Sequence, residues 1–234
     1  MNEHAWFSAG AIIGLALGAS FDSSAMAAPA DSASVLSSKF RNDRGFFHVG
    51  YQRNEIGRGF DGQSVLTGGN VAVLLPKMDP GEGVGVSIGG KGAYLGGDFG
   101  YQRVKHGAEW LGARGAALFQ AVDFGFRFYP LPGWPVEPYI RTGGGFKWLI
   151  VRDAASKAGE IGDAKYTDFG WDIGGGADIF LHRRILLEAS VTQSSIEYGA
   201  VTAVKGDWSP IDVDIDAGGL QYRLALAYCF GAPR

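Results

Sequence analysis

The chain has 234 residues, a length that one all-β domain can fill, and its 21 basic and 24 acidic residues give a formal charge of −3. This balance excludes the basic excess that a nucleic-acid-binding protein normally carries, so no nucleic-acid partner is expected. A single cysteine, Cys229, excludes a disulfide framework and a cysteine-rich metal site. The 38 glycines, with 13% aromatic and only 19% charged residues, favour closely packed strands over a helical bundle.

The N-terminal stretch predicts an exported protein. Ala5 to Ala19 is apolar, and Ala25-Met26-Ala27 fits the small-x-small cleavage pattern, so residues 1–27 are interpreted as a cleaved signal peptide. Met1 to His4 lacks Lys and Arg, which departs from the usual pattern, and a short buried helix is the alternative. Residues 28–43 are rich in Ala, Ser and Asp and are predicted to form a flexible lead.

The rest of the chain alternates with a period of two residues, which is typical of strands with two different faces. The clearest case is the segment from Leu220 to Phe230, in which one parity is large and apolar and the other is small or polar. The same pattern predicts strands at residues 47–52, 95–102, 123–128, 139–150, 168–182 and 187–192.

The position of the eighth strand is less clear. We expect it within Ser64 to Leu75, where Val71, Val73 and Leu75 alternate less cleanly. Residues 76–91 would then have to be a short turn, for which they are too long. Val84 to Ile88 could instead belong to a strand, so the register of this region stays open.

The two faces decide between a soluble and a membrane barrel. A narrow interior has no room for stacked Phe, Trp and Tyr from every strand, but it can hold Gly, Ala and paired charges. Large apolar side chains outside and small or polar ones inside are the pattern of a membrane barrel. We therefore predict an all-β, antiparallel up-and-down transmembrane β-barrel of about eight strands over residues 44–230, with residues 231–234 as a C-terminal extension.

Connection lengths support this topology. Residues 54–63, 105–116, 152–165 and 199–216 are polar or irregular and are predicted to be long outer loops. The Pro-rich stretch 130–135 and residues 182–184 are short and turn-like, as expected at the periplasmic end.

Several motifs resemble the small outer-membrane β-barrel proteins of the OmpA/OmpX-like kind, over residues 45–230. They are Arg127-Phe128-Tyr129 before the Pro-rich turn, Glu137-Pro138-Tyr139-Ile140 before Gly143-Gly144-Gly145, Asp168-Phe169-Gly170-Trp171 before Gly174-Gly175-Gly176, and the closing Leu224 to Phe230. The resemblance implies the outer membrane as location and assembly by the outer-membrane insertion machinery, which in this family reads a terminal aromatic residue. Here Phe230 is followed by Gly231 to Arg234, a departure from the family pattern.

Charged residues of both signs have the predicted inward parity. Because buried charges are costly unless paired, they are expected to form a network of ion pairs that plugs the lumen, with a polar proton or ion path as the alternative. The predicted members are Asp123, Arg127, Arg141, Lys147, Asp168, Asp172, Asp178, Glu188 and Arg223.

No cofactor, metal or catalytic site is predicted. Asp212, Asp214 and Asp216 begin like a calcium loop, but Ala217 occupies the glycine position and Arg223 replaces the closing Glu. The glycine triplets lack the Lys-Ser/Thr that a phosphate-binding loop needs.

The histidines do not form a Ser-His-acid arrangement in the sequence pattern. His48 has inward parity, His106 lies in a predicted loop and His182 in a turn, while His4 leaves with the signal. We therefore expect a non-enzymatic barrel that serves envelope integrity or surface interaction through its outer loops, in contact with outer-membrane lipid and lipopolysaccharide. A lipid A-modifying barrel enzyme and a soluble periplasmic lipid-binding barrel with the opposite facing are the alternatives.

Overall fold

The structure, a computed structural model, describes residues 44–68, 71–157, 160–182, 184–203 and 210–231. The predicted signal peptide and N-terminal lead lie outside these residues. The strands are β1 (Arg44–Ile56), β2 (Val65–Gly68), β3 (Val71–Leu74), β4 (Lys77–Met78), β5 (Gly81–Lys91), β6 (Leu95–Trp110), β7 (Ala113–Phe128), β8 (Val136–Lys157), β9 (Glu160–His182), β10 (Ile185–Ala203), β11 (Ile211–Asp216) and β12 (Gly219–Phe230). In the described part of the chain no helix is long and apolar enough to span a membrane.

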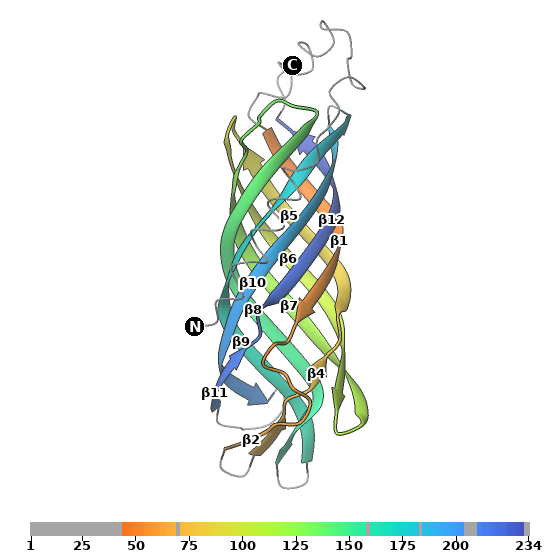
Figure 1. The fold of residues 1–234 in the computed structure, drawn as a ribbon, viewed down its shortest axis with the longest axis vertical. Coiled ribbons are helices and arrows are strands. Elements are labelled where there is room, and N and C mark those ends of the chain that lie inside the picture. The colour runs from red at the N-terminus through yellow and green to blue at the C-terminus, as the bar shows by residue number, and fades with distance from the viewer. Residues whose placement is uncertain (1–43, 69–70, 158–159, 183, 204–209, 232–234) are drawn as a thin grey trace, which may run out of the picture.

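Eight of these strands close into a barrel (Figure 1). The antiparallel ring runs β1-β5-β6-β7-β8-β9-β10-β12 and returns to β1, where Gly45 pairs with Phe230 and Ile56 with Gly219. Closure leaves every long strand paired on both edges, which is what a strand needs in a medium that offers no hydrogen bonds. The predicted up-and-down barrel of eight strands is confirmed.

The predicted position of the eighth strand was wrong. The strand is β5, which pairs with β1 and β6, whereas Ser64 to Leu75 contains the small hairpin β2-β3. The β2-β3 hairpin lies at one end of the barrel, where β3 pairs with residues 155–157 of β8. Val71 and Val73 are buried there, and Val84, Val86 and Ile88 of β5 are the side chains that face outward. Glycines on the inner face of β5 concealed its alternation.

We call the two ends of the barrel the turn end and the loop end. At the turn end β5 is followed by β6, β7 by β8 and β9 by β10, with the described residues 92–94, 129–135 and 184 between them. At the loop end β1 is followed by β5, β6 by β7, β8 by β9 and β10 by β12, with the described residues 57–68, 71–80, 111–112 and 210–218. The whole of β8 has 22 residues and the whole of β9 has 23, roughly twice the ten or so that cross a membrane, and the excess extends toward the loop end.

The predicted loops are therefore mostly strand. Residues 105–116 form the tip of the β6-β7 hairpin, 152–165 the tip of the β8-β9 hairpin, and 199–216 include the end of β10 and all of β11. Residues 54–56 belong to β1, so the loop that was predicted at 54–63 begins at Gly57. These segments are polar because they extend beyond the apolar band. Their strands nevertheless stay paired by backbone hydrogen bonds.

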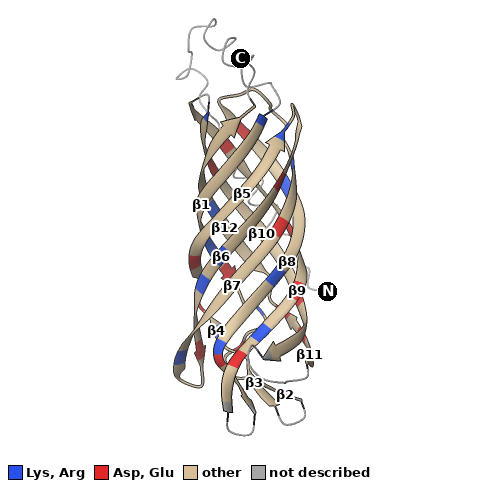
Figure 2. Ribbon diagram, turned by 180° about the vertical axis from the view of Figure 1, so that it is seen from behind, with Lys and Arg blue, Asp and Glu red and all other residues tan. Residues whose placement is uncertain are grey.

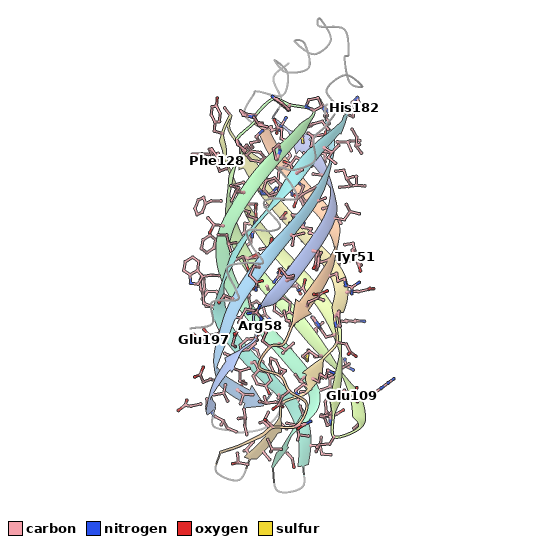
Figure 3. The ribbon with its side chains drawn as sticks, in the orientation of Figure 1. Tyr51, Arg58, Glu109, Phe128, His182 and Glu197 are labelled. Carbon is pink, nitrogen blue, oxygen red and sulfur yellow. The ribbon has the colours of Figure 1, made fainter. Side chains whose placement is uncertain are left out.

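The outer surface near the turn end is an apolar band. Figure 3 shows Phe128 pointing away from the barrel near the end that holds His182, with Glu109 and Glu197 toward the other end. The band consists of large side chains that are at least 36% exposed: Phe47, Val49, Tyr51, Val84, Val86, Ile88, Leu95, Phe99, Tyr101, Phe124, Phe126, Phe128, Ile140, Phe146, Trp171, Ile173, Leu224, Leu226, Tyr228 and Phe230. An apolar exterior of this extent is expected of a barrel that faces lipid.

The lumen has two halves. Toward the loop end, apolar side chains from the wall pack against Phe60, Val71, Val73 and Leu75 of the 57–80 connection. Toward the turn end the interior is charged, and Figure 2 shows acidic and basic positions distributed around the strands.

The seam between β12 and β1 depends on Gly219. A β-carbon at this position would overlap the carbonyl oxygen of Glu55 on β1. We expect Gly219→Ala to lower the free energy of unfolding in lipid vesicles by about 1–3 kcal/mol, measured by urea titration, because the seam would have to move apart. Gly97→Ala is the matched control, since its nearest atom would lie at 3.6 Å. Equal urea midpoints for the two variants would contradict this account.

Candidate functional site

The charged half of the lumen is built by alternation along the strands. On β7, Phe124 and Phe126 face outward, so Asp123 and Arg127 face inward. Gly125 lies between Asp123 and Arg127 on the same face of the strand. A β-carbon at this position would lie 2.5 Å from the guanidinium carbon of Arg141. Glycines on the inner face thus make room for the long arginine side chains.

Arg127 is the centre of the network and is 1% exposed. Its Nε donates to Oδ2 of Asp98 at 2.6 Å, and one terminal nitrogen donates to Oε2 of Glu188 at 3.0 Å. The same nitrogen lies 3.9 Å from Asp178. Its guanidinium carbon is 4.6 Å from the ring centre of Tyr139. Carboxylates from three different strands and the rings of Tyr139 and Phe46 therefore surround a single buried cation.

Two more arginines extend the network. Arg141 donates to Oδ1 of Asp98 at 2.9 Å and lies 3.6 Å from Asp123. Arg223 lies 3.7 Å from Glu188 and donates to the Ser87 hydroxyl at 2.8 Å. Asp98 and Glu188 each contact two arginines, so the removal of either carboxylate would leave two cations poorly compensated.

Lys147 forms a separate buried cluster on the side of the loop end. Its ammonium group contacts the Asp172 carboxylate and donates to the Ser194 hydroxyl at 2.6 Å. Lys147 and Ser194 are fully buried, and Asp172 is 4% exposed. All three therefore depend on one another for hydrogen bonds.

A third cluster closes the turn end. Glu137 is fully buried and forms ion pairs with Arg44, at 2.9 Å, and with Lys91. The backbone N–H of Gly133 donates to its other oxygen at 2.6 Å. Lys91 also lies 4.2 Å above the ring of Tyr129. This cluster joins β1, β5 and β8 to the Pro-rich turn.

A small polar cavity of about 40 Å³ lies between the Arg127 cluster and the apolar half. Its lining includes three carboxylates and two arginines, together with glutamine and hydroxyl side chains. Those polar residues are Gln52, Ser87, Asp98, Gln102, Asp123, Arg141, Glu188, Ser190, Thr192, Gln221 and Arg223.

Comparison with known proteins identifies the architecture. No protein-family model and no curated protein matches the sequence. Among solved structures, the outer membrane protein OprG from Pseudomonas aeruginosa superimposes with a TM-score of 0.58 at 13% identity, over 81% of this chain and 97% of that one. The chain has the fold of the small outer-membrane β-barrel proteins.

Two further barrels give similar values. A major outer membrane protein from Thermus thermophilus has a TM-score of 0.52 at 15% identity, over 80% of this chain and 99% of that one. Neisserial surface protein A has a TM-score of 0.51 at 11% identity, over 80% and 97%. The outer-membrane barrel thus shares its architecture with them, and the low identities limit the likeness to the fold.

Eight of the nine predicted lumen charges lie in the clusters described above. Asp168 does not join them: its carboxylate accepts the backbone N–H of Gly199 at 3.0 Å and of Phe169 at 2.7 Å. It lies where the β9-β10 ladder is interrupted, between Ile196 and Val201 of β10. The Asp168 carboxylate therefore accepts a hydrogen bond from the N–H of Gly199, although strand alternation alone predicted it to be in the lumen network.

Sequence reasoning missed Asp98, Glu137, Arg44, Lys91 and His48 as members of these clusters. Asp98 and His48 have the inward parity of their strands, which was a usable signal. Lys91 could be found only with β5 in its true register. Arg44 and Glu137 are the first and second residues of their strands. The alternating pattern is too short there to assign a side chain to one face.

Three residues of catalytic type do meet in the lumen. His48 Nδ1 lies 3.2 Å from the Ser87 hydroxyl and 3.1 Å from Oε2 of Glu188. Because both partners face the same ring nitrogen, the imidazole does not bridge them as a proton relay requires. All three are at most 3% exposed, inside a wall that separates them from lipid.

Asp212, Asp214 and Asp216 lie on β11, and their side chains are exposed. Within the described ranges no group of three or more His, Cys, Asp or Glu side chains could hold a metal ion. Cys229 is a free, buried thiol on the inner face of β12.

Proposed function

We propose that this outer-membrane barrel is a non-enzymatic envelope protein whose lumen is closed by ion pairs and whose loop end faces the exterior of the cell. The observation that carries the proposal is the Arg127 cluster, in which a fully buried cation contacts carboxylates of three strands. A lumen filled in this way favours a structural or surface role over transport. The apolar exterior and charged interior do not fit the soluble lipid-binding alternative.

The loop end offers the surface for external contacts. The hairpins β6-β7 and β8-β9 extend beyond the apolar band, and their tips carry exposed side chains such as Leu111, Arg114 and Ile161. We also propose that the assembly machinery recognises the end of β12, where Phe230 faces outward and is 42% exposed.

The first experiment is gel migration of the detergent-extracted protein with and without boiling, on isolated outer membranes. We expect the unboiled protein to migrate differently from the boiled protein, because a closed barrel stays folded in detergent. A strain that lacks the protein should become more sensitive to detergent. A chain with the β6-β7 tip shortened between Glu109 and Arg114 should keep the gel shift and test the surface role separately.

The lipid A-modifying alternative rests on the contact between His48, Ser87 and Glu188. Lipid A from cells that express the wild type, His48→Ala or Ser87→Ala is expected to have identical mass spectra. A mass change that occurs with the wild type and disappears in both variants would establish the enzyme instead.

A further inference from the structure

The turn of residues 57–62, which we call the Phe60 plug, occupies the lumen at the loop end. Phe60 is 3% exposed. Its ring meets those of Tyr166 on β9 and Tyr198 on β10 edge to face, with centroid separations of 5.3 Å and 6.5 Å. One aromatic side chain therefore packs against rings from two neighbouring strands of the wall.

The plug is attached to the barrel by few backbone hydrogen bonds. Gly59 N–H donates to the Asp216 carbonyl at 2.6 Å, and the Leu111 N–H reaches the Gly62 carbonyl at 3.4 Å. Gly57 and Gly62 flank the plug with φ of 126° and 77°, a region that favours glycine. The plug thus lies between two flexible positions and outside the continuous ladders of the wall.

Hydrogen bonds of the Asp61 side chain hold the end of the plug to the two residues that follow it. Asp61 accepts backbone N–H groups from Gln63 at 2.9 Å and Ser64 at 2.8 Å. The Ser64 hydroxyl and these N–H groups lower the pKa of Asp61 to about 2, so the side chain is ionised at neutral pH. These bonds span Gly62 and hold the end of the plug, which leaves Gly57 as the position about which Phe60 can turn.

Several buried polar atoms on the strands of the barrel lack hydrogen-bond partners, among them those of the two tyrosines that Phe60 contacts. The hydroxyls of Tyr166 and Tyr198, and both amide atoms of Asn54, are buried without a hydrogen bond. A buried group without a hydrogen bond is less stable than the same group in water. Phenylalanine or leucine would fill the same space without this cost. The cost disappears when water replaces the plug, so these groups favour an open state.

A polar route leads from these groups to the lumen cavity. Asn54 pairs with Gln221 across β1 and β12, and Gln221 accepts a hydrogen bond from Gln102 at 3.3 Å. Both glutamines line the cavity, as does Gln52, two residues from Asn54. Beyond the cavity the route ends at Arg127, which is packed between its carboxylates.

We propose that the Phe60 plug is a lid that withdraws to open the lumen cavity to the external solution, while the Arg127 cluster keeps the turn end closed. The barrel then contains an outward-facing pocket, not a through-pore. Its lining has the carboxylates of Asp98, Asp123 and Glu188 and two arginines, and Arg127 pairs with two of these carboxylates, so the charges balance and the pocket suits small polar solutes. The direction of opening rests on the proposed function, which places the loop end outside.

The test measures how fast a thiol in the cavity reacts. Thr192 lines the cavity, so Thr192→Cys is made in a Cys229→Ser chain and reconstituted into lipid vesicles. A small cationic methanethiosulfonate reagent is added outside, and external trypsin, which cuts at the exposed Arg114, identifies barrels with the loop end outward. We expect Phe60→Ala to raise the labelling rate about tenfold, as a 1.4 kcal/mol loss of lid closure would, and Phe60→Leu to raise it less.

The controls separate the lid from the fold. Leu111→Ala, at a side chain 73% exposed on the β6-β7 tip, should leave the rate unchanged. Equal labelling rates for the wild type and both Phe60 variants, in chains that keep the gel shift, would overturn the lid and leave the proposed function intact. Labelling that is as fast in barrels with the turn end outward would overturn the closure at Arg127.

Discussion

Replacing Arg127 with methionine is expected to lower the free energy of unfolding of the barrel by about 3–5 kcal/mol, because it removes the buried cation that Asp98, Asp178 and Glu188 share. Asp98 and Glu188 are 7% and 1% exposed and would each lose a short charged hydrogen bond. The measurement is urea-induced unfolding of the protein in lipid vesicles, followed by tryptophan fluorescence. Arg53→Met is the matched control, since its nearest carboxylate is Glu55 at 3.9 Å and its side chain is 48% exposed.

We expect the control to change stability by less than about 1 kcal/mol. A second variant, Arg127→Met combined with Glu188→Leu, should regain part of the loss, because one of the uncompensated carboxylates is then gone. A loss at Arg127 no larger than that at Arg53 would mean that water reaches the network and screens it. The lumen would then be open to solvent rather than closed by ion pairs.

An arginine at Phe146 is expected to cost about 2–4 kcal/mol, the penalty for a cation near the middle of a bilayer on the lipid face of a barrel. Phe146 is 60% exposed, and along the outer face of β8 it lies between Val136 near the turn end and Arg152 toward the loop end. It also meets Phe169 edge to face at 5.6 Å, so Phe146→Leu is needed to separate loss of this contact from the cost of the charge.

The matched control is Ile161→Arg, because Ile161 is 72% exposed but lies at the loop end, opposite Ser156. We expect little change there, since the side chain is outside the bilayer. The measurement is the folding free energy into vesicles for both variants. Similar costs at residues 146 and 161 would contradict the position of the apolar band, and no cost at either would contradict a lipid-facing exterior.

Alternation by itself determined the class of fold and the facing of most strands. The residues from Leu220 to Phe230 alternate between large apolar and small or polar side chains, and in the structure Leu224, Leu226 and Tyr228 face outward while Ala225 and Ala227 are buried. A strand has a period of two whatever it pairs with, so this information is local. The same argument placed Arg127, Glu188 and Lys147 in the lumen.

The position of β5 could not be obtained in this way. Val71 and Val73 alternate as well as Val84 and Val86 do, but the first pair packs inside the loop end and the second faces lipid. Glycines at positions 83 and 85 leave this part of the inner face of β5 without side chains, so the alternation beside Val84 and Val86 is hard to see. Only pairing with β1 and β6 distinguishes the two segments, and pairing is a property of the closed sheet.

The partners of the charges were likewise decided by the tertiary structure. Arg127 is 29 residues from Asp98 and 61 residues from Glu188 along the chain. The stagger between strands determines which inward side chains meet across the lumen, and it arises only when the sheet closes. The sequence alone therefore determined which side chains face inward and which face lipid, because strand alternation is local; the tertiary structure decided which of them meet, because barrel closure is not.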